Sequence, residues 1–290
     1  MIRSPVDLIP LPLIVFALVG GPVGLPPADT PTQLHSYAVA AVTNDQAASA
    51  AACDHLRANG PAGLDALLTE HQDVLAKGAA DPRWTRVTAA IDRVAAQKDA
   101  FSSRLYWYTD LEEAKVAAKA SGKPILSLRM AGRLDRDPSG TNSQYFRNSL
   151  YADPKVSALL RERFVLHWES EAPATSVTLD FGAGQKLEQP VTDSSVHWVL
   201  DADGRPVDAI PGLAGAGAFR RELSEDADLE RSLRGLTTTE RASRLSKHHA
   251  LKRAVESDEW PAFLVDAAPA GSPTTNQAAG PVARRPFSPS

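Results

Sequence analysis

Hydrophobic residues in the middle of the chain follow two spacings, one typical of buried strands and one typical of amphipathic helices. Short apolar runs predict strands at 105–108, 125–130, 164–168 and 196–200. The second run is apolar on both faces except at Ser127 and Arg129. A strand with two apolar faces usually lies in the middle of a sheet that is covered on both sides. We therefore expect 125–130 to be the central strand.

Helices are predicted between and after these strands, and two of them have clear start signals. Asp110 with Glu113 forms a capping box before one helix, which Gly122 ends. Asp153 and Pro154 begin a second helix. Two further helices are expected at 142–150 and 219–233. Helices that alternate with strands in this way are typical of an α/β fold.

Turn signals predict two places where the chain reverses. Segments 177–181 and 185–189 alternate in polarity around a glycine-rich turn, which is a hairpin signal. Asp201–Gly204 is a tight turn that returns the chain antiparallel at 206–210. The expected sheet is therefore mixed, with parallel strands first and an antiparallel hairpin last.

Residues 33–104 are rich in alanine and have helical spacing, so we expect a small helical region before the sheet. Helices are predicted at 37–58, with an interruption near Thr43, at 64–77, and from Asp81 onwards, where Pro82 suits a first helical turn. The region is interpreted as a scaffold for the rest of the chain. A helical surface that binds a partner is the alternative.

The two ends of the chain differ from ordinary domain sequence. Residues 1–32 combine a charged start, an apolar run over 8–25 and a linker, which is typical of a secretory signal or a membrane anchor. Prolines interrupt the run, whose length is near the lower limit of about 17 residues for a spanning helix. We therefore expect a secreted or cell-envelope protein, tethered to the membrane if the segment is retained. At the other end, a polar helix is predicted over 236–260 and a disordered tail over 261–290.

Charge and cysteine content exclude several classes of protein. The net charge is -4, and the longest cationic cluster, Lys247 to Arg253, is short, so no nucleic-acid partner is predicted. We expect that cluster to be a solvated helix face. Cys53 is the single cysteine, which excludes an internal disulfide, a C-x-x-C pair and a thiolate metal site. No metal and no cofactor are predicted.

Three segments in order resemble the thioredoxin superfamily: WYTDLEEAKVAAKASGKPIL, DPKVSALLRERFV and VLDADGRPV. The resemblance covers 105–235. It implies a thioredoxin-like mixed sheet with helices on both faces, closed by the last hairpin and helix. The fold class expected for the whole chain is α/β, with the small helical region preceding this domain.

The residues that make this family redox-active are missing from the sequence. The position of the family's C-x-x-C pair falls in the segment from Ser139 to Ser143, and the position of its cis-proline falls near Ser194 and Ser195. Disulfide exchange needs sulfur at the attacking and leaving positions, so dithiol activity is not expected. The resemblance then implies a binding module for an unidentified protein or peptide. Its candidate binding residues are Ser139, Gly140, Thr141, Asn142, Ser143, Ser194 and Ser195.

Two alternatives keep a chemical role for the same face. One is an enzyme outside dithiol chemistry, with a polar pocket lined by His167, His197 or Ser195. The other is a redox participant that uses Cys53 alone. His167 and His197 lie on predicted strands that flank the central strand, roughly 10 Å apart, which is too far for one zinc ion. Both are interpreted as core histidines.

Overall fold

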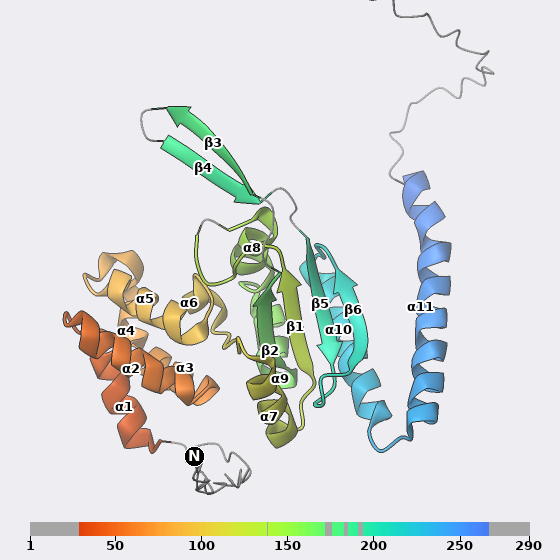
Figure 1. Ribbon diagram of the computed structural model, residues 1–290, viewed down its shortest axis with the longest axis horizontal. Helices are drawn as coiled ribbons and strands as arrows, with labels where there is room; N and C mark the ends of the chain where they lie inside the picture. Colours follow the sequence, from red (N-terminus) through yellow and green to blue (C-terminus); the bar gives the residue numbers. More distant parts are fainter. Residues whose placement is uncertain (1–28, 138, 172–175, 183–184, 191–193, 267–290) are drawn as a thin grey trace, which may run out of the picture. The chain divides into compact units, whose positions relative to one another are not determined.

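The computed structural model describes residues 29–137, 139–171, 176–182, 185–190 and 194–266. The chain divides into two compact units, one up to Tyr106 and one from Trp107 onwards (Figure 1). The sequence predicts this boundary at 104/105. Of the predicted signal or anchor segment with its linker (1–32), residues 1–28 lie outside the described residues, as do residues 267–290 of the predicted tail (261–290).

The first unit is helical. Its elements are α1 (Pro31–Ala40), α2 (Gln46–Ala58), α3 (Pro61–Glu70), α4 (Gln72–Lys77), the 3-10 turn η1 (Gly78–Ala80), α5 (Trp84–Ala95) and α6 (Ala100–Ser103). Its core contains the fully buried side chains of Leu56, Leu64, Leu67, Ile91 and Val94. The interruption predicted near Thr43 is present between α1 and α2. These residues come from α2, α3 and α5, so the three helices share one core.

Three helix boundaries in this unit differ from the prediction. The first helix begins at Pro31, because Thr30 and Gln33 form a capping box that the sequence analysis missed. The helix expected over 64–77 breaks at His71, the residue between α3 and α4. The Asp81 carboxylate accepts a hydrogen bond from the Arg83 backbone N–H at 2.8 Å, so α5 begins only at Trp84.

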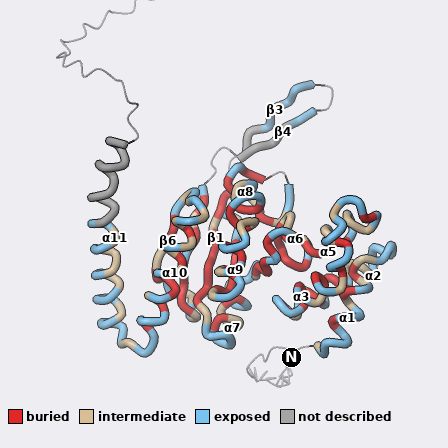
Figure 2. The backbone as a smooth tube through the Cα atoms, turned by 180° about the vertical axis from the view of Figure 1, so that it is seen from behind, coloured by how far each residue is buried: buried red, intermediate tan, exposed pale blue. Residues whose placement is uncertain are grey.

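The second unit is built on a mixed four-stranded sheet in the order β2-β1-β5-β6. Its strands are β1 (Ile125–Met130), β2 (Val165–Ser170), β5 (Ser195–Leu200) and β6 (Pro206–Pro211). β1 pairs parallel with β2 and antiparallel with β5, and β5 pairs antiparallel with β6. As predicted, β1 is central, and it is buried along its length except at Arg129 (Figure 2). The α/β class with a mixed sheet is confirmed.

The strand expected over 105–108 is reduced to one bridge. Tyr108 donates its backbone N–H to the Leu166 carbonyl at 2.8 Å and accepts the N–H of Trp168 at 3.1 Å. This bridge is parallel and places Tyr108 beside His167 of β2. The preceding residues of the predicted strand make no ladder pairing in the described part of the chain.

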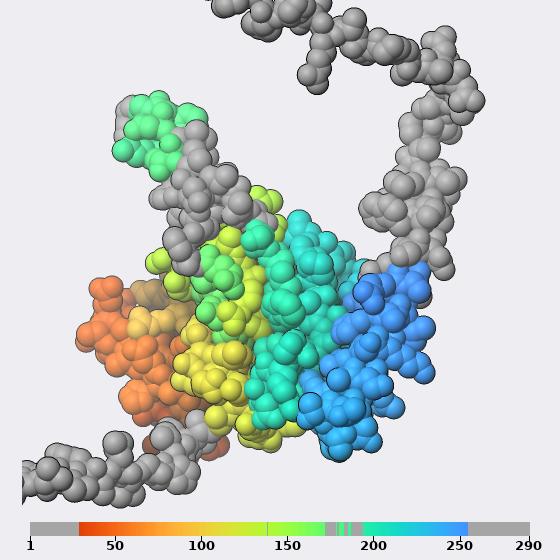
Figure 3. All heavy atoms as spheres, turned by 45° about the vertical axis from the view of Figure 1, so that its right-hand side comes forward, coloured from red at the N-terminus to blue at the C-terminus, as the bar shows by residue number. Residues whose placement is uncertain are grey.

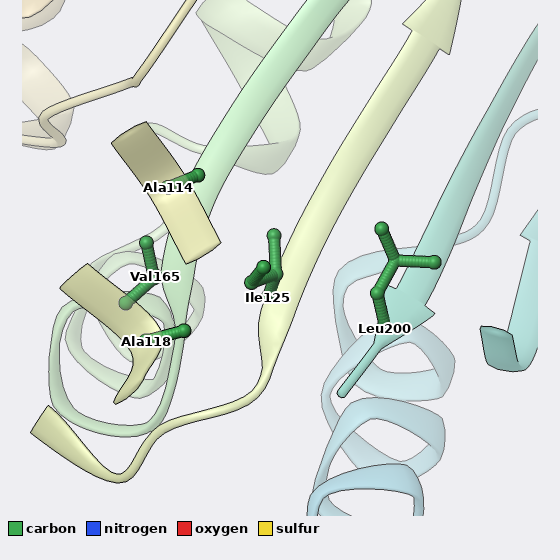
Figure 4. Packing of buried hydrophobic residues seen from close by; sticks show 5 residues of the cluster. All are labelled: Ala114, Ala118, Ile125, Val165 and Leu200. Atoms are coloured by element: carbon green, nitrogen blue, oxygen red, sulfur yellow. The ribbon is translucent and has the colours of Figure 1, made fainter. Parts of the chain in front are cut away.

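Each face of the sheet is defined by the strand register. Ile125 pairs with Val165 on one side and with Leu200 on the other, and all three pack against Ala114 and Ala118 of α7 (Leu111–Ser121) (Figure 4). We call this side the α7 face. The opposite side, here the α10 face, is covered by α10 (Ala216–Leu233) and α9 (Pro154–Arg163) (Figure 1).

The connection from β1 to β2 contains more than one helical segment. The helix predicted over 142–150 is divided into α8 (Thr141–Tyr145) and a π-helical turn, η2 (Phe146–Leu150). α9 follows, and the Asp153 carboxylate caps it by accepting the N–H groups of Lys155 and Val156 at 2.9 Å each. The predicted Asp153–Pro154 start is therefore confirmed.

Between β2 and β5 the chain forms the predicted hairpin of β3 (Ser176–Gly182) and β4 (Gln185–Pro190). In the described part of the chain these two strands pair only with each other, as a two-stranded sheet. The hairpin therefore does not extend the main sheet.

The last helix, α11 (Thr238–Asp266), is longer than predicted and continues into the segment expected to be disordered. The prediction of a solvated face at Lys247 to Arg253 is wrong for the side of α11 that faces β6. Lys252 Nζ lies 3.1 Å from a carboxylate oxygen of Asp208 on β6, and His248 is half-buried. The cause is that β6 supplies an opposite charge, which the sequence of the helix itself does not reveal.

The packing of α7 on the sheet leads to a stability prediction. Ala118 is fully buried against the sheet. We expect Ala118→Leu to lower the free energy of unfolding by about 1–3 kcal/mol, because the added carbon atoms must push α7 off the strands. Urea denaturation measures the change. The control is Ala120→Leu on the exposed side of the same helix, which should change stability by less than about 0.5 kcal/mol. Equal stability of the two variants would contradict the packing.

Candidate functional site

The loop predicted to bind a partner follows β1 and leads into α8, but most of it is buried. Ser139, Asn142 and Ser143 are buried, as is the backbone position Gly140, whereas Thr141 is exposed. Gly140 occupies the N-cap of α8 and no side chain caps this helix. Of the five predicted loop residues, only Thr141 therefore presents its side chain to solvent.

Hydrogen bonds within the chain occupy the buried side chains of this loop. Asn142 Nδ2 donates to Ser195 Oγ at 2.9 Å. Ser143 Oγ donates to the Arg133 carbonyl oxygen at 2.9 Å. Ser139 Oγ donates to Asp137 Oδ1 at 3.2 Å. The structure thus brings Asn142 and Ser195 together from the two segments that the sequence analysis proposed, and uses them to join the loop to the start of β5.

Arg147 is a central residue of this loop that sequence reasoning missed. Its side chain is 2% exposed, and its Nη2 donates to Asp137 Oδ1 at 2.7 Å and to Ser139 Oγ at 2.8 Å. The guanidinium therefore holds both ends of the short segment before α8. Nothing in the local sequence distinguishes Arg147 from an ordinary solvent-facing helix residue.

These contacts leave little scope for catalysis in the loop. The hydrogen bonds of the three buried serine hydroxyls go to a carbonyl, a carboxylate, a guanidinium and an amide. A serine nucleophile needs an adjacent base such as histidine. Among the described residues, no histidine makes a hydrogen bond to any of these serines.

The two strand histidines lie on opposite faces of the sheet. His167 pairs with Ser127 of β1, whereas His197 pairs with the next residue, Leu128. Neighbouring residues of a strand point to opposite faces, so His167 faces α7 and His197 faces α10. The expectation that they flank β1 is correct, but they cannot share a site, because the sheet itself separates them.

Each histidine is a buried core residue, as predicted. His167 Nδ1 and Ser127 Oγ share a hydrogen bond of 2.8 Å, and burial, with a smaller contribution from Arg129, lowers the pKa of His167 to about 4. His197 Nε2 and the Tyr151 hydroxyl share one of 2.6 Å, and burial lowers the pKa of His197 to about 3. Both rings are therefore neutral at pH 7.

Among the described residues, no helix covers one part of the α7 face. Trp198 of β5 is 38% exposed, although its strand neighbours Val199 and His197 on the α10 face are buried. Beside it on the same face, Arg129 and Glu169 form an ion pair of 2.7 Å. We call the surface formed by Arg129, Glu169, Val196, Trp198 and Ala209 the open face. It begins where the cover provided by α7 ends.

Cys53 belongs to the first unit, on α2. Its side chain is 2% exposed, and burial raises the pKa of its thiol above the ordinary value, outweighing the opposite influence of Arg93. A thiol of this kind is a poor nucleophile, because the reactive species is the thiolate.

We find no match to this chain among protein-family models, curated proteins or solved structures. Within the described residues, every helix is too short or too polar to cross a membrane. The segment for which a signal or anchor is predicted lies outside those residues.

The buried state of His197 predicts an acid-sensitive stability. The pKa of this ring is about 3 in the folded chain and 6.5 ordinarily. Between these values the unfolded chain binds a proton that the folded chain does not, so the free energy of unfolding falls as the pH is lowered through this range. We expect His197→Gln to flatten the dependence near pH 5 by about 1.4 kcal/mol per pH unit. Urea unfolding over a pH series measures the slope.

Tyr151→Phe is the matched control for this prediction. It removes the hydrogen-bonded hydroxyl but keeps the imidazole, so it should lower stability and preserve the wild-type slope. Nitrogen chemical shifts of the His197 ring provide a direct check in the wild-type chain. A ring that gains its proton near pH 6.5 would contradict a buried neutral histidine.

Proposed function

We propose that residues 107–233 form a thioredoxin-like domain without dithiol chemistry, which serves as a binding module for a protein or peptide partner. The sheet order, with a parallel pair followed by an antiparallel pair, supports the family assignment. So does the order of elements along the chain, which ends in the β5–β6 hairpin and the closing helix α10. The β3–β4 hairpin is a departure, because this family often has a helix there.

The observation that carries the proposal is the exposure of Trp198 on the open face. A sheet face is normally covered, because its apolar side chains are stabilised by removal from water. Here the connection between β2 and β5 is a hairpin that pairs with itself, so this connection adds no helix to the α7 face. The loss of that helix accounts for an uncovered surface on a frame that is otherwise retained.

The chemistry of the open face suits a protein or peptide. Tryptophan and arginine are the residues most enriched among those that dominate binding energy at interfaces. Trp198 and Val196 supply apolar area, and the Arg129–Glu169 pair supplies charged groups at its border. Thr141 and Ser194 are the exposed residues that remain from the predicted binding loop. Since Ser194 directly precedes β5, we include it in the proposed surface.

The composition of residues 1–32 supports export or membrane tethering, which is part of the same proposal. A binding module without a reactive group would act there by holding its partner. The alternative of a redox participant through Cys53 is disfavoured by the burial of that thiol.

The Cys53 alternative can be tested by thiol chemistry. We expect the native chain to react with dithiobis(nitrobenzoic acid) at least roughly 100-fold more slowly than the chain unfolded in urea, because the thiol is buried and protonated. The release of the coloured thiolate measures both rates. Rapid reaction of the native chain would restore Cys53 as a redox candidate.

The binding surface can be tested by photo-crosslinking in the native cells. We place p-benzoylphenylalanine at position 198 and, as a control, at position 116, since Val116 is similarly exposed on α7. A partner that crosslinks stoichiometrically from position 198 and not from 116 is the expected result. For the purified pair, Trp198→Ser should weaken binding by about 2 kcal/mol, or roughly 30-fold, as for an interface anchor.

Two further variants test the extent of the binding surface. Val116→Ser should bind the partner as the wild type does, whereas Ser194→Lys should weaken binding through the bulk and charge at the edge of the surface. Far-UV circular dichroism checks that each variant is folded. If Trp198→Ser binds the partner with wild-type affinity, the open face is not the binding surface.

A further inference from the structure

A cluster of potential metal ligands lies between β6 and α11, the helix coloured blue in Figure 3. Asp208 comes from β6, and His248 and His249 come from consecutive positions of α11. Each offers one ligand atom, and these three atoms all lie within 4.8 Å of one another. The residues are distant in sequence, so the fold brings them together.

The distances in this cluster are close to those of a bound cation. His248 Nε2 lies 3.4 Å from Asp208 Oδ2, and His249 Nδ1 lies 3.8 Å from Asp208 Oδ1. In a tetrahedral zinc site with bonds of about 2.0–2.2 Å, neighbouring ligand atoms lie about 3.3 Å apart. His248 Nε2 is buried and makes no hydrogen bond to any described residue.

A second, independent feature is the carboxyl group of Asp226, on the inner side of α10. This residue is 1% exposed, and its Oδ2 has no hydrogen-bond partner among the described residues. Its carboxyl group is close enough to that of Asp208 for the two groups to interact electrostatically. A buried acceptor without a donor is costly.

A path from solvent reaches the cluster. A pocket of about 560 Å³ is lined by Asp208, Glu222, Ser246, His249 and Lys252. In this structure Lys252 Nζ lies 3.1 Å from Asp208 Oδ2 and 3.6 Å from Glu222 Oε2. The ammonium group neutralises Asp208, and it can move towards Glu222 when another cation takes its place.

We propose that Asp208, His248 and His249 form a binding site for a divalent transition-metal cation, with Asp226 as the carboxylate behind them. Two imidazoles with one or two carboxylates suit zinc and similar metals, whereas magnesium and calcium prefer all-oxygen sites. A bound cation would join α11 to the edge strand β6. The proposal is independent of partner binding at the open face, which shares none of these residues.

The test is a zinc titration of the full-length chain, produced without a histidine tag and treated with chelator. Calorimetry should show saturable binding of one ion. We expect His249→Gln and Asp208→Asn each to weaken binding by roughly 10- to 100-fold or more. Lys252→Gln should keep or raise the affinity, because it removes a competing cation. His35→Gln, at an exposed histidine of the first unit, is the matched control and should bind as the wild type does.

X-ray absorption of the zinc-loaded chain gives a second readout, which should show nitrogen and oxygen neighbours with two imidazoles. His249 is half-exposed, so its variant should remain folded, and circular dichroism checks this. The absence of saturable zinc binding by the wild-type chain would overturn the proposal. So would equal affinities of the wild type, His249→Gln and Asp208→Asn.

Discussion

Burial of β1 on both faces is the constraint on which the second unit depends. β1 pairs with β2 along one edge and with β5 along the other, so its register decides which face every neighbouring side chain reaches. Ser127 and Leu128 point to opposite faces, so their pairing partners, His167 and His197, also lie on opposite faces. A slip of one residue between β1 and β5 would exchange the faces of β5. It would move His197 away from its aromatic neighbours Phe146 and Phe219 and turn Trp198 into the core.

Most elements of this unit could be predicted, because they depend on local signals. Asp153 caps a helix through the N–H groups two and three residues further on, and Asp201–Gly204 forms a turn within four residues. The register could not be predicted, because distant strands decide it, and the apolar spacing alone would have allowed both histidines on one face. The prediction of a first strand over 105–108 was wrong for a related reason. Its sequence suits a strand, but only Tyr108 reaches a pairing partner.

In the candidate loop as well, the sequence predicts the elements but not which side chains are buried. The sequence correctly indicated a polar segment leading into a helix after the central strand, and it paired that segment with the start of β5. It could not indicate burial, because serine and asparagine serve equally well in solvent or in an internal network. Arg147 determines which side chains of the loop are buried. By binding Asp137 and Ser139 from a buried position, it turns the loop inward and leaves Thr141 as its exposed side chain.

The open face and the docking of α11 both depend on elements outside the main sheet. The β3–β4 hairpin pairs with itself. On α11, Arg241 forms an ion pair with Asp201, which precedes β6, and His248 and Lys252 lie beside Asp208 of β6. Apolar burial is non-directional, whereas an ion pair needs its particular partner and is weakened by salt. The core elements therefore fix the fold, and the peripheral ones are attached by contacts that a competing ligand can replace. The two proposed surfaces lie on opposite faces of the sheet, because Trp198 pairs with Ala209 and the next residue, Val199, pairs with Asp208.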